Sequence, residues 1–210
     1  LNLKYYLLMR KIITIIFLFW IVFIFNLFAS EYEKGVNAFN NRDYVTALKY
    51  FQKLTDQGNA KGQNGLGKMY AEGLGVTRDC KKALKFFKLS AEQGYVSAQN
   101  NLAHFYKMGL CDTPDFKEAI KWYRLSAKQE NDEAQGHLGA MYANGEGVTQ
   151  DFKEALKWFL LSAEQGNDTA QYNLGVMYDS GKGVTQDFKK ALKWYRLSAE
   201  QGNDTAQYNL

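Results

Sequence analysis

The sequence contains few residues of the types that build disulfide scaffolds and metal sites. Its 210 residues include two cysteines and two histidines. Two cysteines exclude a disulfide-dense scaffold, although an exported chain could oxidise one pair. A histidine-based metal site needs clustered ligands, and the sequence offers only His104 and His137. We therefore predict no metal site and no cofactor.

A large excess of one charge is also missing. Residues 1–30 carry three basic side chains and no acidic one, so residues 31–210 carry 26 − 3 = 23 basic against 22 acidic side chains. The net charge of this part is close to +1. A nucleic-acid-binding protein would carry a strong basic excess, so nucleic acid is excluded as the expected partner.

Residues 1–30 have the composition of an export segment. Basic residues (Lys4, Arg10 and Lys11) precede a mainly apolar run from Ile12 to Phe25, and the small pair Ala29 and Ser30 follows. This order is typical of a secretory signal peptide. An uncleaved anchor is the alternative, because a helix over residues 12–29 would reach roughly 27 Å, close to the thickness of a bilayer core. We expect a periplasmic or secreted protein, or one anchored in the inner membrane by residues 12–29. Only this segment, if uncleaved, would contact a membrane.

The rest of the chain repeats itself every 36 residues. LSAEQGNDTAQYNL occurs at 161–174 and again, unchanged, at 197–210, and alanine recurs at 98, 134, 170 and 206. A period between 20 and 50 residues indicates a solenoid. We divide the chain into residues 31–58, four repeats at about 59–96, 97–132, 133–168 and 169–204, and the start of an incomplete repeat at 205–210. Because repeat arrays normally close with a polar terminal unit, we expect a fragment, or a tail that frays.

Each repeat predicts two helices. The first helix carries apolar residues four apart and stops at a glycine such as Gly145. The second begins after an aspartate such as Asp151, whose carboxylate can accept free amide protons of the first turn, and ends at a glycine such as Gly166. The second repeat has Glu130 in place of that last glycine. We expect Asn131 to take the left-handed conformation there, or the junction to be looser.

The repeated phrase, AQxxLGxMYxxGxGVxxDxKxALKWxxxSAEQG, resembles the Sel1-like repeat, a relative of the tetratricopeptide repeat. The match covers about residues 59–210, and residues 31–58 resemble a plain tetratricopeptide unit. The resemblance implies an all-α fold, a right-handed α/α solenoid of helix-turn-helix repeats. It also implies a role as an adaptor or assembly scaffold that binds protein or peptide partners, and not as a rule a catalyst.

Two other functions stay open beside the adaptor. Some cysteine-rich relatives of this family are β-lactamases or penicillin-binding proteins, but the SxxK, SDN and KTG elements of such serine enzymes are missing, as are their paired cysteines. The serine of each LSA phrase recurs in every repeat, which is typical of a packing residue and not of a nucleophile. We predict no catalytic residue. The third reading is a structural segment of a longer repeat array.

Comparison of the repeats with one another predicts the binding surface. Positions two, six and nine residues after the recurring alanine vary and lie on one face of the first helix. We call this set the variable stripe and expect it to bind the partner, with the aromatic Tyr172 and with His104 as anchors; drift on a solvated face is the alternative. The partner-binding candidates are Asn100, His104, Lys107, Tyr172, Val176 and Asp179.

The two cysteines lie in neighbouring repeats. Cys80 stands where the other repeats have phenylalanine, on the predicted buried face of a helix, so its default role is that of a small apolar residue. Cys111 replaces a loop glycine in the next repeat. A disulfide between them is geometrically conceivable.

Overall fold

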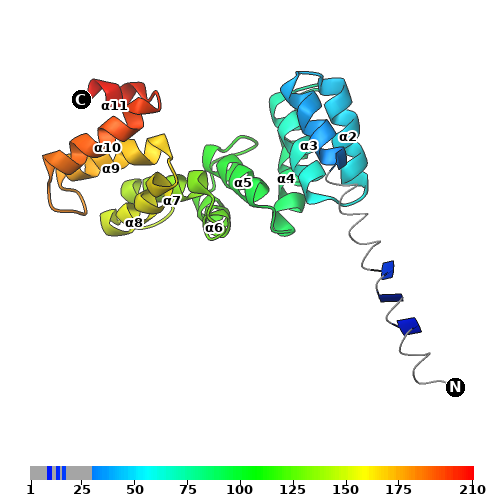
Figure 1. The fold of residues 1–210 in the computed structure, drawn as a ribbon, viewed down its shortest axis with the longest axis horizontal. Helices are drawn as coiled ribbons and strands as arrows, with labels where there is room; N and C mark the ends of the chain where they lie inside the picture. The colour runs from blue at the N-terminus through cyan, green and yellow to red at the C-terminus, as the bar shows by residue number, and fades with distance from the viewer. Residues whose placement is uncertain (1–8, 11–12, 15, 18–29) are drawn as a thin grey trace. The chain divides into compact units, whose positions relative to one another are not determined.

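The computed structural model describes residues 9–10, 13–14, 16–17 and 30–210. The predicted signal peptide or anchor therefore falls almost entirely outside the described residues. Within the described residues, none of the helices has the length and apolar character needed to cross a membrane. All regular structure in this part of the chain is helical (Figure 1), and it confirms the all-α solenoid.

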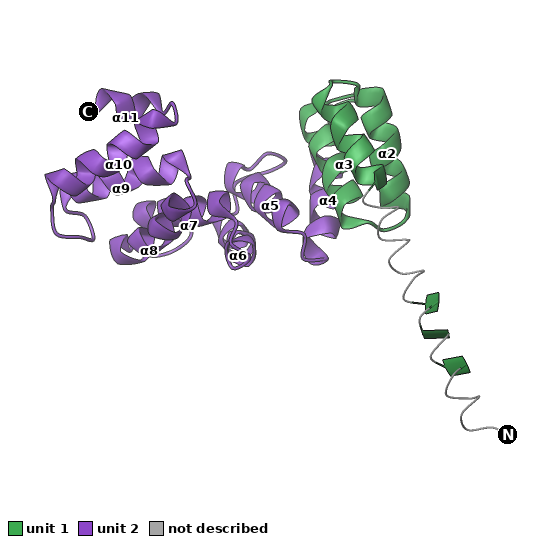
Figure 2. Ribbon diagram, in the orientation of Figure 1, with its two compact units in different colours: residues 1–79 green, residues 80–210 purple. Residues whose placement is uncertain are grey.

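The chain divides into two compact units (Figure 2), the first ending at Asp79 and the second running from Cys80 to Leu210. In the first unit, residues 30–40 are helical and are followed by α2 (Tyr44–Asp56) and α3 (Ala60–Glu72). Phe51 is buried at the centre of this unit, and a side chain added at Gly65 would place its first carbon 2.7 Å from the Phe51 ring. Glycine is thus required for α3 to approach α2 this closely.

The second unit holds the remaining helices, which follow one another as antiparallel pairs (Figure 1). Their bounds are α4 (Cys80–Glu92), α5 (Val96–Met108), α6 (Phe116–Ala127), α7 (Asp132–Asn144), α8 (Phe152–Glu164), α9 (Asp168–Ser180), α10 (Phe188–Glu200) and α11 (Asp204–Tyr208). From α4 to α11, each helix packs against the next one along the chain, so apolar faces are buried by sequence neighbours, as expected for a solenoid.

The helix ends follow the predicted signals. The side chain of Asp151 accepts the backbone N–H groups of Lys153 and Glu154, at 2.9 and 3.0 Å, and so satisfies free donors of α8. Gly145 ends α7 in the left-handed conformation, with φ of 74°, which a residue with a side chain rarely adopts. The short loops therefore have the same path in most repeats.

The prediction for the junction after α6 was wrong. Glu130 itself takes the left-handed conformation, with φ of 64°, whereas Asn131 has φ of −70°. Asn131 is instead the N-cap of α7, because its side chain accepts the N–H of Ala134 at 2.8 Å. The chain keeps the geometry that glycine provides in the other repeats, with a glutamate in the strained position.

Buried glutamines join the repeats. Gln135 of α7 donates to the carbonyl of Ala127, at the end of the preceding repeat, and its own side-chain oxygen accepts from Gln165, the C-cap of α8. The same pair of bonds recurs one repeat later at Gln171, with Ala163 and Gln201 as partners. These bonds give the carbonyls at the end of the preceding repeat a second partner, beside the backbone N–H of the turn that follows each helix. They explain why the glutamines of the AQ and EQ phrases do not vary.

The recurring serines are packing residues, as predicted. Ser162 is fully buried in α8, and its hydroxyl donates to the carbonyl of Asp132 at 2.7 Å. Ser198 makes the same bond to Asp168 at 2.7 Å, and Ser126 makes it to Val96 at 3.1 Å. Each serine therefore ties the end of a second helix to the first turn of the helix with which it pairs.

Candidate functional site

The variable stripe of the second unit lies on the first helices of its repeats, α5, α7 and α9. Its candidate residues differ in accessibility. His104 and Asp179 are exposed, Lys107, Tyr172 and Val176 are half-buried, and Asn100 is buried, with 7% of its surface exposed. Asn100 therefore cannot act as a surface anchor, and its role has to be sought in the contacts that it makes.

Two contacts tie the α5 part of the stripe to the next repeat. The side-chain amide of Asn100 donates to Glu133 Oε2 of α7 at 2.8 Å. Lys107 Nζ lies 3.5 Å from Glu146 Oε2, in the loop after α7. Since both charges of this ion pair are partly shielded from water, it is held more firmly than an exposed pair. The stripe residues of α5 thus fix two carboxylates of the neighbouring repeat in place.

The two histidines lie together beside these carboxylates. The rings of His104 and His137 have centroids 6.1 Å apart, and the ring of Tyr123 from α6 lies 4.9 Å from that of His137. Burial, with the positive charge of Lys107 and the neighbouring His104, lowers the pKa of His137 to about 4. The surroundings of the His104 ring partly remove it from water, although the residue as a whole is exposed, and this desolvation, followed by the charge of Lys107, lowers its pKa. The face therefore presents neutral imidazoles near pH 7.

Burial also changes the tyrosines behind the stripe. Tyr123 has no exposed surface, and burial raises the pKa of its hydroxyl, as do the negative charges of Glu133 and Glu146. In the last full repeat, the ring of Tyr172 lies 5.9 Å from that of Tyr195. Burial, followed by Asp179 and Tyr172, raises the pKa of Tyr195 to about 12. Both phenols remain protonated and neutral.

A hollow of about 320 Å³ opens beside His137, between α7 and the start of α9. Its floor is α7, where the stripe has Gly136 and Ala140 in place of the larger residues of the neighbouring repeats. Its lining contains two carboxylates and no lysine or arginine. The lining residues are Glu133, Gly136, His137, Ala140, Asn167, Asp168, Thr169 and Asn173. We call this cavity the acidic hollow.

Sequence reasoning missed several residues of this site. Glu133 and His137 lie four residues apart on α7, just beside the predicted stripe, and both positions vary between repeats. Their variation is the signal that could have identified them. Tyr123 gave no comparable signal, because tyrosine and phenylalanine alternate at its position and both are expected in a core.

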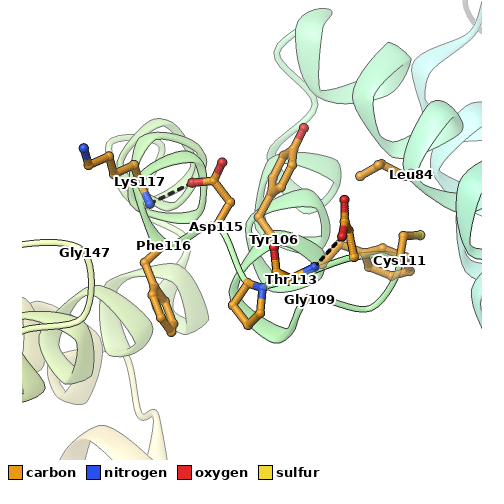
Figure 3. Close-up of a pocket in the computed structure, with 12 residues that line it drawn as sticks. Leu84, Tyr106, Gly109, Cys111, Thr113, Asp115, Phe116, Lys117 and Gly147 are labelled. Atoms are coloured by element: carbon orange, nitrogen blue, oxygen red, sulfur yellow. Dashed lines mark hydrogen bonds between the residues drawn. The ribbon is translucent and has the colours of Figure 1, made fainter.

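A second hollow, of about 550 Å³, lies at the loop between α5 and α6 (Figure 3). Leu84 of α4 and Tyr106 of α5 contribute to its walls, together with Cys111 and Asp112 of the loop. The equivalents of Asp112, such as Val148, are half-buried valines, whereas Asp112 is exposed and its carboxylate accepts the Thr113 N–H at 2.8 Å. The hollow exists because an apolar side chain is missing from this loop.

The side chains that line the two hollows determine what they could hold. Among the described residues, no group of three or more histidine, cysteine, aspartate or glutamate side chains is arranged to hold a metal ion. No disulfide joins Cys80 and Cys111 in this part of the chain, and both side chains are half-buried. The acidic hollow offers negative charge, amide groups and a hydroxyl, which suit a positively charged group with hydrogen-bond donors.

Comparison with known families identifies the repeats. The Sel1 repeat matches the chain in five consecutive copies, at residues 24–59, 60–95, 96–131, 132–167 and 168–203. The first copy includes the segment that resembles a plain tetratricopeptide unit. No match is found among curated proteins.

Solved structures with this fold come from several bacteria. A protective antigen of uropathogenic Escherichia coli, described as displaying an SLR fold, is 42% identical, with a TM-score of 0.73 over 79% of this chain and 35% of that chain. This chain thus spans about a third of the antigen. A Sel1 repeat protein from Oxalobacter formigenes is 33% identical, with a TM-score of 0.78 over 84% of this chain and 70% of that one.

A more distant likeness supports the fold alone. A putative Sel1 repeat protein from Klebsiella pneumoniae is 24% identical, with a TM-score of 0.60 over 87% of this chain and 90% of that chain. Three findings lead to one conclusion: the repeated helix pairs, the hydrogen bonds that cap and join them, and the five matched copies. This chain belongs to the Sel1 repeat family.

Proposed function

We propose that this protein is a non-catalytic adaptor that binds a protein or peptide partner along the face formed by α5, α7 and α9. The Sel1 repeat solenoid supports this role, since stacked repeats present an extended surface built from many similar helices. The surface is held in place by contacts between repeats, such as those of Asn100 with Glu133 and of Lys107 with Glu146. A partner would therefore meet a preformed surface, which lowers the entropic cost of binding.

The acidic hollow is the observation that carries the proposal. It is large enough for one long side chain, and its lining includes the neutral ring of His137 on α7 and Thr169 and Asn173 of α9. Glu133 is positioned by Asn100, and Asp168 accepts from Asn203 at 3.1 Å, so both carboxylates point in fixed directions. We infer that the partner presents a lysine or arginine side chain to this hollow in an extended segment.

Selection of peptides by the full chain tests this proposal. We expect a random peptide library selected on the purified protein to become enriched in lysine or arginine at one position. Ala140→Lys places a positive charge at the hollow and should weaken binding of the selected peptides at least about tenfold, or about 1.4 kcal/mol. Ala140→Gln, which has similar length and no charge, should weaken it much less.

Controls separate this face from the rest of the solenoid. Lys193→Ala changes an exposed residue of α10, away from the stripe, and should leave binding unchanged. Combined replacement of Tyr172, His104 and Lys107 by alanine should abolish it, provided that far-ultraviolet circular dichroism shows an intact helical fold. Selection without basic enrichment, or full binding by the triple variant, would overturn the proposal.

We also propose that the protein is exported. The order of basic, apolar and small residues in residues 1–30 supports export to the periplasm or beyond, or an anchor in the inner membrane over residues 12–29. Cell fractionation followed by N-terminal sequencing tests this. A mature chain starting at Glu31 would support a cleaved signal, and an intact chain in the membrane fraction would support the anchor. An intact chain in the cytosolic fraction would contradict both.

A further inference from the structure

Neighbouring repeats touch at one recurring pair of positions. The second glycine of the loop after each first helix approaches the first residue of the preceding second helix, and 147 − 116 = 31 residues separate them. A Cβ atom added at Gly147 would lie 2.6 Å from Phe116 Cβ, and one added at Gly183 would lie 2.8 Å from Phe152 Cβ. Gly75 and Tyr44 repeat this contact in the first unit, at 3.0 Å.

The only two cysteines of the sequence occupy this pair of positions. Cys111 replaces the loop glycine, and Cys80 is the first residue of α4, with the same separation, 111 − 80 = 31. A single cysteine at one of these positions would indicate only a small side chain. The sequence has no other cysteine, and its two cysteines occupy the two positions that contact each other between neighbouring repeats. This coincidence favours a bond between them.

The two cysteines belong to elements that border the same hollow. Cys111 and Leu84 line the same hollow, and Figure 3 shows both on its α4 side. Cys80 lies four residues before Leu84 on α4, so the two side chains extend from the same helix face, one turn apart. Cys80 and Cys111 are both half-buried.

The loop backbone at Cys111 differs from that of the equivalent glycines. Gly147 and Gly183 have φ of 71° and 75°, whereas Cys111 is not among the residues in the left-handed region. The Cβ separations of the glycine joints are shorter than the roughly 3.5–4.5 Å between Cβ atoms in a disulfide. The backbone at residue 111 therefore differs from that at Gly147 and Gly183, where the Cβ separation would be too short for a disulfide.

We propose that Cys80 and Cys111 form a disulfide that links the start of α4 to the loop between α5 and α6. The bond forms by thiol–disulfide exchange with a small disulfide oxidant such as oxidised glutathione. One thiolate attacks the oxidant and releases one reduced glutathione, and the second thiolate then displaces the other. Two protein thiols are oxidised to one disulfide, and one glutathione disulfide is reduced to two thiols. The cross-link fixes the loop that walls the hollow of Figure 3.

Intact-mass measurement of the full chain tests the cross-link. The protein is equilibrated with reduced and oxidised glutathione, and remaining thiols are then alkylated with iodoacetamide. We expect the monomer to lose two hydrogens, to gain no alkyl group and no glutathione, and to yield one peptide pair joined through Cys80 and Cys111. Cys80→Ser and Cys111→Ser should each gain a glutathione or an alkyl group at the remaining cysteine.

A displaced pair provides the matched control. In Cys111→Ser combined with Thr113→Cys, the second thiol moves two residues along the loop, out of register with Cys80. We expect the natural pair to stay closed at a concentration of reduced glutathione at least about tenfold higher than the displaced pair tolerates. A natural protein that gains two glutathiones or two alkyl groups, or that closes no better than the displaced pair, would overturn the proposal. Circular dichroism confirms that each variant is folded.

Discussion

The ring of His137 packs against the ring of Tyr123, with centroids 4.9 Å apart, directly beneath the surface that we assign to partner binding. The Tyr123 hydroxyl is buried there without a hydrogen-bond partner among the described residues. A buried polar group without a partner lowers the free energy of unfolding. The Tyr123 hydroxyl therefore destabilises the fold slightly, next to the face that we assign to binding.

We expect Tyr123→Phe to stabilise the protein by about 1 kcal/mol, because it removes the unpaired hydroxyl and keeps the ring. Phenylalanine already stands at the equivalent positions 87 and 159. Urea unfolding monitored by circular dichroism measures the change. A loss of stability instead would show that the hydroxyl has a partner in solution.

Acid should destabilise the fold through His137. Its pKa is about 4 in the folded protein and about 6.5 when unfolded, so the unfolded chain binds more protons between these values. The free energy of unfolding should therefore be highest above pH 6.5, fall as the pH drops, and stop falling on this account below pH 4. The expected loss is on the order of 1–3 kcal/mol. His137→Asn, the residue at positions 101 and 173, should flatten the curve in this window, and an unchanged slope would contradict the assignment.

Glu130→Gly should stabilise the junction after α6 by about 1 kcal/mol, because the left-handed conformation is sterically unfavourable for glutamate but not for glycine. Lys128→Gly is the matched control: Lys128 has φ of −65°, so glycine gains nothing there and should be destabilising. Equal effects of the two substitutions in thermal unfolding would show that the conformation of Glu130 carries no strain.

Ser162→Ala should destabilise the protein by about 1–2 kcal/mol, because it removes a buried hydrogen bond to the carbonyl of Asp132. Ser180→Ala, at the exposed end of α9, should change stability by less than about 0.5 kcal/mol. Urea unfolding of both variants compares the two effects. If both were equally mild, the buried serine would have no special role in tying the helix pair together.

Most of the fold could be predicted from the sequence because each repeat carries its own local signals. Asp151 before α8 and Gly145 after α7 set helix ends through backbone geometry within a few residues. The 36-residue period then predicts that the helix pairs repeat and stack as a solenoid. The path of residues 109–115 could not be predicted in the same way. Cys111 and Asp112 stand where the other repeats have a glycine and a valine, so the local signals that set the path of the loop in those repeats are missing here.

The site was predictable only as a face. The repeat pattern placed the variable stripe on the first helices, α5, α7 and α9, but it did not predict which of its residues are accessible, and its role in partner binding stays a prediction. Asn100 is buried because Glu133 of the next repeat lies over it, and the acidic hollow exists because Gly136 has no side chain. Both facts depend on contacts between repeats, which the pattern within one repeat does not contain.

The glutamine bonds between repeats have a consequence for how such a chain can change its length. Gln135 and Gln171 use the same donors and acceptors on both sides, so any repeat of this type can follow any other without redesign of the junction. A gene duplication that adds one 36-residue repeat would therefore yield a chain that folds without further substitutions. The new repeat could then diverge at the variable stripe alone. Interchangeable junctions make the surface free to evolve while the fold stays constant.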